Sequence, residues 1–332
     1  MKRTSLKRFW LVASAITLAT VSCSKSNDDA NNAVQAEQEV QVTTEAAISD
    51  DEAEFMFNDV SDIAMGVNDE AGLDMGIGIF GRAATANETG KVYIANRTDS
   101  LPPTGGGGNQ NPPGGGGTTN PPARCFTVTV TPQAPNVYPR TVTINFGTGC
   151  RGMDGRVRRG KIITVYTGSL RVPNSEATTT FENYFVDSVR VEGTHRFKNV
   201  STSNNRSFRT VVLNGRLTAP NGNYTAWNRE KTWVQTEGNG TPNLPADDVF
   251  SITGSANGTV VRGANSTQWR SEIVQPLIRR FTCRWLVRGQ NRVVRNSGSN
   301  TYTALLDFGN GTCDNQATLT VNGGTPRTIT LR

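Results

Sequence analysis

The five cysteines are the residues whose spacing says most about chemistry. Cys23 stands alone near the N-terminus, and four more follow further along the chain: Cys125, Cys150, Cys283 and Cys313. No Cys-x-x-Cys spacing occurs and His195 is the only histidine. The sequence therefore lacks the usual ligand set of a zinc site. We expect acylation or disulfide chemistry from the cysteines, and no metal or other cofactor.

Residues 1–22 have the features of an export signal. Basic residues come first, and the apolar run Phe9–Ser22 follows. That run has about 14 residues, whereas a membrane-spanning helix needs about 20. No other stretch approaches this length, so we expect no transmembrane helix.

The leader and Cys23 together resemble the type II signal of bacterial lipoproteins, although Thr20 stands where those signals usually have leucine. The resemblance implies cleavage before Cys23 and acylation of that residue, and two or more acyl chains anchor a protein stably. Ser24–Asp29 is similar to the tag that directs Bacteroidota lipoproteins to the outer leaflet of the outer membrane. It implies a lipid-anchored outer-membrane protein exposed at the cell surface, with the leaflet still open.

The other four cysteines would lie where disulfides persist. Opposed residues of an antiparallel hairpin have positions of constant sum, so each possible pair implies one turn. If Cys283 pairs with Cys313, the turn of their hairpin is centred on Gly298, within a cluster of turn residues. If Cys125 pairs with Cys150, the turn is centred between Val137 and Tyr138. A bulge at Gly289 would shift the later register by one residue. The spacing predicts two disulfides, Cys125–Cys150 and Cys283–Cys313.

Charge divides the chain into two parts. Residues 24–101 have 16 acidic and 4 basic residues, whereas residues 124–332 have 26 basic and 12 acidic residues, and 23 of the 26 are arginine. A basic domain attracts polyanions such as anionic glycans or lipopolysaccharide, and arginine binds carboxylate or phosphate bidentately. The alternative is that arginine covers a solvated sheet face and the acidic part partly neutralises it. No nucleic-acid-binding motif occurs, so we expect no nucleic acid partner.

Aromatic and polar residues suited to sugar recognition gather on one predicted strand pair. Rings beside amide and guanidinium groups can stack on sugars and orient hydrogen bonds to them. The candidate ligand-binding residues are Tyr224, Trp227, Arg229 and Trp233. The alternative is that the rings belong to the core, because tryptophan is mostly buried.

Residues that could support catalysis are sparse. His195 lies in the polar stretch Glu192–Lys198 without a nucleophile motif, so we interpret it as an ordinary exposed or half-buried histidine. A glycosidase needs two carboxylates at a defined separation. The available acids are Glu230, Glu237, Asp247 and Asp248, but a domain with twelve acids always contains some pair. The oxygen-rich stretch Asp307–Asn315 lacks EF-hand spacing and predicts a turn.

The N-terminal part divides into segments of different composition. Residues 23–48 predict an acidic tether, and residues 49–100 a helical or irregular acidic segment. Within the latter, a capping site at Ser49 and apolar residues at helical spacing predict one amphipathic helix over about 50–70. The stretch 101–123 is rich in proline and glycine and predicts a linker.

From residue 124 to 332 the sequence predicts an all-β domain. Apolar and polar residues alternate with period two, and turn signals recur at Asn214-Gly215, Asn221-Gly222, Asn257-Gly258 and Asn322-Gly323. About 11–12 antiparallel strands fit as a meander. One apolar face per strand favours a sandwich or a rolled barrel, and an elongated, partly single-layer sheet is the alternative.

The chain as a whole resembles a group of Bacteroidota lipoproteins that carry a Thr-rich β domain and have no assigned activity. The resemblance rests on the turn Phe146–Cys150, the strand Cys283-Arg284-Trp285, the segment Gly309–Asn315 and the ending Thr328–Leu331. It implies a fold group and a location.

These observations favour a non-enzymatic surface-anchored lipoprotein. It would present a basic, disulfide-stapled β domain that binds envelope or extracellular glycans or an envelope protein partner. Two alternatives are a glycan-active hydrolase of the cell envelope and a purely structural envelope component.

Overall fold

The computed structural model describes residues 35–53, 56–57 and 125–331, apart from 135, 152–155, 204, 241–246 and 284. The predicted signal, Cys23 and the predicted linker 101–123 lie outside the described residues. The chain divides into two compact units, Met1–Gln38 and Glu39–Arg332, and the contacts described below belong to the second. No helix in the described part of the chain is long and apolar enough to cross a membrane.

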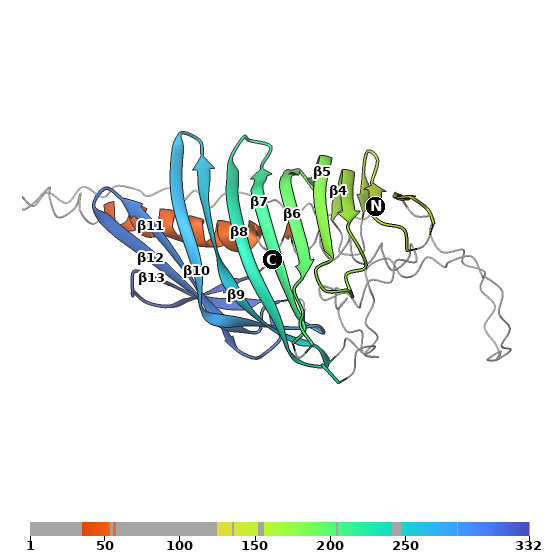
Figure 1. Ribbon diagram of the computed structural model, residues 1–332. Coiled ribbons are helices and arrows are strands. Elements are labelled where there is room, and N and C mark those ends of the chain that lie inside the picture. Colours follow the sequence, from red (N-terminus) through yellow and green to blue (C-terminus); the bar gives the residue numbers. More distant parts are fainter. Residues whose placement is uncertain are drawn as a thin grey trace, which may run out of the picture. The chain divides into compact units, whose positions relative to one another are not determined.

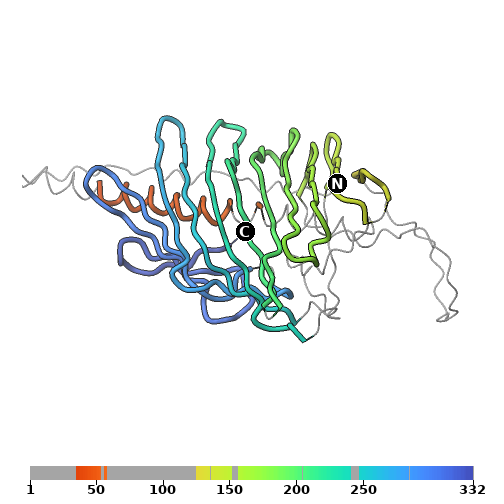
Figure 2. The backbone as a smooth tube through the Cα atoms, viewed as in Figure 1, coloured from red at the N-terminus to blue at the C-terminus, as the bar shows by residue number. Residues whose placement is uncertain are grey.

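The second unit is built on one antiparallel sheet of fourteen strands (Figures 1 and 2). The strands are β1 (Thr127–Thr131), β2 (Arg140–Asn145), β3 (Cys150–Arg151), β4 (Val157–Tyr166), β5 (Glu176–Val186), β6 (Val189–Asn199), β7 (Ser207–Thr218), β8 (Tyr224–Glu237), β9 (Val249–Arg262), β10 (Asn265–Arg280), β11 (Arg288–Ser297), β12 (Asn300–Asn310), β13 (Gln316–Val321) and β14 (Arg327–Thr330).

The antiparallel meander predicted from the sequence is confirmed. Strands pair in sequence order from β1 to β14, except that β3 pairs only with β4 and lies off this path. The sheet is single and does not close into a barrel, so the single-layer alternative is the arrangement found. There are fourteen strands instead of 11–12 because the sheet includes very short strands, such as the two-residue β3 and the four-residue β14.

Alternating side chains give the sheet two different faces. On β8 the residues at odd positions from Thr225 to Gln235 are buried, whereas those between them are half-buried or exposed. We call the face that carries Trp227 and Arg229 the inner face, and the opposite face, which carries Asn228, the outer face. Residues paired across neighbouring strands share a face. The pairing of β8 with β7 and β9 therefore shows which residues of those strands lie on the inner face and which on the outer face, and the same holds for each further strand.

Two of the four expected Asn-Gly turns are correct. Asn221-Gly222 and Asn322-Gly323 lie in turns, with glycine at positive φ. Asn214-Gly215 and Asn257-Gly258 instead lie inside the long strands β7 and β9.

The two strand-internal glycines make room for tryptophan. A Cβ atom on Gly258 would stand 2.7 Å from Trp269 Cζ2 and 2.9 Å from Trp227 Cβ, and one on Gly215 would stand 2.8 Å from Trp227 Cε2. The Asn-Gly pairs were misread because a glycine required by a distant ring looks locally like a turn glycine.

Both predicted disulfides are present. Cys125 is bonded to Cys150, and Cys283 to Cys313. The hairpin of β11 and β12 turns at Gly298, and its register shifts between Arg288 and Gln290, at the predicted bulge. The pairings are those predicted, but the register is not, because Thr127 pairs with Asn145 and Ser297 with Asn300, so neither cysteine pair lies in register with its hairpin. The disulfides join residues beyond the ends of these ladders, and Cys150 lies on β3, which pairs with β4.

The helix begins earlier than predicted. Residues 35–53 are helical, and residues 56–57 are helical as well, so the predicted tether 23–48 overlaps the helix. Residues 58–70 of the predicted helix lie outside the described residues. The helix buries Thr43, Ala46, Ala47, Asp50, Ala53 and Phe57, which recur at helical spacing on one face. As far as Ala53 this face is made of small and polar residues, so the apolar pattern did not reveal the earlier part of the helix.

Candidate functional site

The helix lies against the inner face of the sheet (Figure 1). Among the described residues 125–331, six basic side chains are buried but Asp248 is the one buried acid; the six are Arg140, Arg158, Arg229, Lys231, Arg279 and Arg295. Buried cations need anionic or hydrogen-bonding partners, because burial removes their hydration. The acidic helix supplies such partners to two of them.

Arg295 on β11 holds the beginning of the docked helix. Its Nη2 donates to the Glu39 carboxylate and to the Glu39 backbone carbonyl, the latter at 2.7 Å, and its Nε donates to Thr43 Oγ1 at 2.7 Å. Ser297 Oγ donates to the other Glu39 carboxylate oxygen at 3.1 Å. The guanidinium also lies over the Tyr302 ring, 4.5 Å from its centroid. Arg295 therefore binds a carboxylate, a carbonyl and a hydroxyl together.

Asp50 forms a second ionic contact on β8, which lies three strands from β11 in the sheet order. Arg229 Nη2 on β8 donates to its carboxylate at 3.0 Å and to its backbone carbonyl at 2.9 Å. Asn291 Nδ2 on β11 donates to the other carboxylate oxygen at 2.9 Å. The side chains of Arg229 and Asp50 are only 6% and 4% exposed, so this ion pair is screened little by solvent.

The last described helical residue, Phe57, enters an aromatic cluster. Its ring lies 5.1 Å from that of Trp227, 5.7 Å from Phe181 and 6.0 Å from His195. His195 is buried, and burial, followed by the nearby charge of Arg229, lowers its pKa to about 4. The histidine is therefore neutral near pH 7 and forms part of the packed interior.

The structure separates the four residues predicted to bind a ligand. Trp227 and Trp233 are only 2% and 1% exposed, and Arg229 is bonded to the helix. Tyr224 lies on the outer face, where Arg216 stacks on its ring at 3.7 Å from the centroid. Three of the four thus belong to the inner face beneath the helix, which agrees with the core interpretation of both tryptophans.

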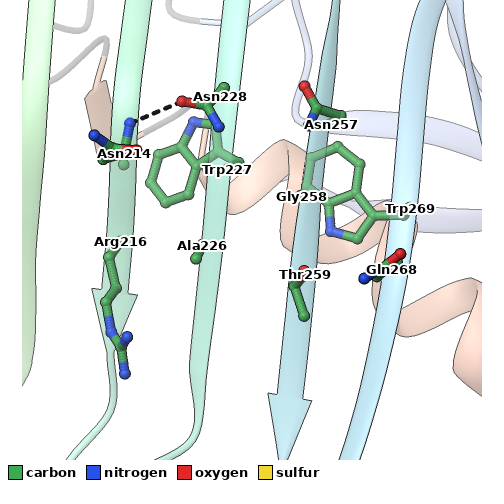
Figure 3. A pocket seen from close by; sticks show the side chains of 11 residues that line it. Asn214, Arg216, Ala226, Trp227, Asn228, Asn257, Gly258, Thr259, Gln268 and Trp269 are labelled. Carbon is green, nitrogen blue, oxygen red and sulfur yellow. Dashed lines mark hydrogen bonds between the residues drawn. The ribbon is translucent and has the colours of Figure 1, made fainter.

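A shallow groove of about 550 Å³ lies across β7, β8, β9 and β10 (Figure 3). Asn228 and Asn257 are paired across β8 and β9, and Asn257 is paired with Arg270 on β10, so these three side chains form a row on the outer face. Asn228 Oδ1 accepts a bond from the Asn214 backbone N–H at 2.9 Å. Arg216, Thr259 and Gln268 complete the polar lining.

A second groove of about 780 Å³ adjoins the first and shares Asn257 with it. Its charged lining residues are Arg270, Glu272 and Arg292, and Arg292 pairs with Glu272 at 3.4 Å. Arg270 is exposed, and no hydrogen bond or ion pair joins its side chain to another described residue. The two grooves together expose amide, hydroxyl and guanidinium groups across five neighbouring strands.

Glu237, Asp247 and Asp248 lie near one another at the connection between β8 and β9, but none of the four candidate catalytic carboxylates lines either groove. Glu230 is on the outer face, paired with Arg209 at 2.6 Å. Asp248 is buried, accepts a bond from Gln235 Nε2 at 2.6 Å and lies 3.7 Å from Arg206 Nη1. Burial raises the pKa of Asp248 to about 6, although Arg206 opposes the shift.

The other polar clusters serve turns. Both Asp307 carboxylate oxygens accept hydrogen bonds, one from the Gly309 backbone N–H and one from Gln290 Nε2. Asp314 caps the backbone N–H of Gln316. Within the described ranges, no three His, Cys, Asp or Glu side chains lie together as metal ligands would.

Comparisons with family models, with curated proteins and with solved structures find no match to this chain. Two features of the site were missed by sequence reasoning. The Asn228–Asn257–Arg270 row depends on strand register, and the docking of the acidic helix depends on which arginines are buried. The opposite charges of the two parts of the chain were the available signal for the second.

Proposed function

We propose that this protein is a non-enzymatic lipoprotein, anchored in the outer membrane through Cys23, whose β domain binds envelope or extracellular glycans. The observation that carries the proposal is the row of amide and guanidinium groups along the grooves of the outer face. Planar amides and guanidinium groups bind sugar hydroxyls and carboxylates through directed hydrogen bonds.

The outer face is the accessible one of the two. The inner face is covered by the helix where it contacts β8 and β11, and the rings of Trp227 and Trp233 are buried. On the outer face, hydrogen bonding and not aromatic stacking would dominate recognition. A free Arg270 beside Asn257 favours glycans that carry carboxylate or phosphate groups.

Changing the asparagine row tests the proposal. The full chain with Cys23→Ser is titrated with polygalacturonate, a polymer of acidic sugars, and compared with the same chain carrying Asn228→Ala and Asn257→Ala. Loss of two or more hydrogen bonds of about 1 kcal/mol each is expected to weaken binding roughly tenfold or more.

Asn300→Ala is the matched control, because Asn300 is an exposed asparagine at the β11–β12 turn, outside both grooves. Its affinity should equal that of the parent chain. Equal affinity of all three proteins would show that the outer-face grooves do not bind this glycan.

A further inference from the structure

The sheet is complete without the helix. Strands pair with their neighbours in the sequence, and the helix contributes no strand to the order. The helix is held instead by side chains of the inner face: Arg295, Ser297, Asn291, Arg229, Arg262 and Arg327. This is the chemistry of a protein–protein interface, in which one surface recognises a separate element.

The recognised element has a definite chemical pattern. A carboxylate at Glu39 meets Arg295, a second carboxylate at Asp50 meets Arg229, and an aromatic ring at Phe57 meets Trp227. Small residues between them, Ala46, Ala47 and Ala53, are all fully buried. The inner face therefore fits an acidic amphipathic helix with a narrow contact face.

The covalent connection between helix and sheet is long. Residues 58–124 separate Phe57 from Cys125, and they include the glycine runs Gly105–Gly108 and Gly114–Gly117. About 70 residues can span at most roughly 230 Å. The distance between two neighbouring domains is well within this limit, so the sequence does not confine the helix to the sheet of its own chain.

We infer that the inner face is an interaction surface for a second copy of this chain, whose acidic helix, described at residues 39–53 and 56–57, docks there in exchange. The exchanged helix makes the same contacts as the helix of the same chain, so exchange costs no interaction. The connecting segment sets the effective concentration at which a chain's own helix competes for its sheet. The fraction of helices docked on a second copy should therefore rise with the concentration of the chain.

Thiol cross-linking between two differently substituted chains tests the inference. Thr44 Oγ1 of the helix accepts a hydrogen bond from Arg327 on β14, so these positions mark a docked helix. A donor chain carries Thr44→Cys and Arg295→Glu, and an acceptor chain carries Arg327→Cys and Glu39→Lys. Both full chains also carry Cys23→Ser, which leaves one free thiol in each beside the two disulfides.

The charge changes disfavour docking within each chain. Glu39 would face Glu at position 295 in the donor, and Lys at position 39 would face Arg295 in the acceptor. Only the donor helix on the acceptor sheet restores the Glu39–Arg295 pair. A short bis-maleimide should therefore give about tenfold more covalent dimer in the mixture than in either chain alone. This factor assumes that the Glu39–Arg295 ion pair raises the affinity of the helix for the sheet about tenfold.

Random collision is measured with an acceptor that carries Asn228→Cys on the outer face in place of Arg327→Cys. Equal dimer yields from this control and from the test mixture would overturn the inference. One chain carrying both Thr44→Cys and Arg327→Cys should cross-link within itself, and failure to do so would overturn the docked geometry.

Because Arg295 is buried, Arg295→Glu can unfold the donor sheet. A second donor with Thr44→Cys alone keeps the test valid. Mixed with Arg327→Cys alone, it should form a covalent dimer whose fraction rises with chain concentration above that of the Asn228→Cys control. A yield equal to the control at every concentration contradicts exchange.

Discussion

His195 and Asp248 are buried titratable side chains whose pKa values move in directions that both favour the neutral form. The pKa of His195 falls from 6.5 to about 4, mainly because of burial, and that of Asp248 rises from 3.8 to about 6, also because of burial. Between pH 4 and 6.5 the unfolded chain binds more protons than the folded chain at His195. Between pH 4 and 6 the folded chain binds more at Asp248.

The two groups therefore make opposite contributions to stability. Acidification from pH 6.5 to 4 lowers stability through His195 and raises it through Asp248, each by roughly 2–3 kcal/mol. In the parent chain these contributions oppose each other. His195→Gln should make stability rise on acidification relative to the parent, and Asp248→Asn should make it fall.

Urea unfolding at pH 7, 5.5 and 4, with the disulfides intact, measures these differences. Because the three proteins share all their other carboxylates, the difference between variant and parent reports mainly on the substituted group. Parallel pH profiles for the three proteins would show that neither side chain is desolvated in the folded state.

Residue types predicted burial better than they predicted a binding site. Trp227 and Trp233 were candidates for sugar stacking, yet both are buried on the inner face. The alternation of residue types along β8 correctly separates the buried odd positions from the more exposed even positions. It does not show that the helix covers the face of the odd positions. The row formed by Asn228 and Asn257 depends on pairing across β8 and β9, which local sequence does not specify.

At the scale of elements, the disulfide pairings were predictable, whereas the helix was predicted only in part: residues 50–53 and 56–57 are helical as expected, but the helix extends back to residue 35. Both disulfides were predicted correctly because the cysteines of each pair flank one local turn region, although the observed registers differ from those assumed. On the buried face of the helix, Thr43 and Asp50 bond to arginines and Ala46 and Ala47 are small, so this face has little hydrophobic contrast. Periodicity detects a helix only where burial selects apolar residues.

A double-mutant cycle measures the ionic contact that holds the helix. Glu39→Gln, Arg295→Gln and the double variant are compared by hydrogen exchange of the helix amides, which reports local opening. The Arg295 side chain is 3% exposed and that of Glu39 is 26% exposed. We expect a coupling free energy of about 1–3 kcal/mol.

The exposed pair Lys161–Glu182 on β4 and β5 is the matched control. Its side chains are 35% and 52% exposed at an N–O distance of 2.8 Å, so its coupling in global unfolding should not exceed about 1 kcal/mol. A coupling for Glu39 and Arg295 no larger than that of the control would mean that the inner face does not select the acidic helix.

For the molecule as a whole, the acidic N-terminal part and the basic β domain contact each other, because the acidic helix lies against arginines of the inner face. The sequence analysis left open whether arginine covers a solvated face or binds polyanions. Arginine lies on both faces: Arg229 and Arg295 are neutralised by the acidic helix, whereas Arg270 remains exposed on the outer face. Part of the basic charge, including that of Arg270, is thus left for an external partner on the outer face.

The most direct test of glycan binding is equilibrium titration of the full chain, with Cys23→Ser, against neutral glycans, anionic glycans and lipopolysaccharide at low and high salt. We predict saturable binding to an anionic member, weaker at high salt because exposed charges such as Arg270 are screened. No saturable binding to any member at either salt concentration would contradict the proposed function.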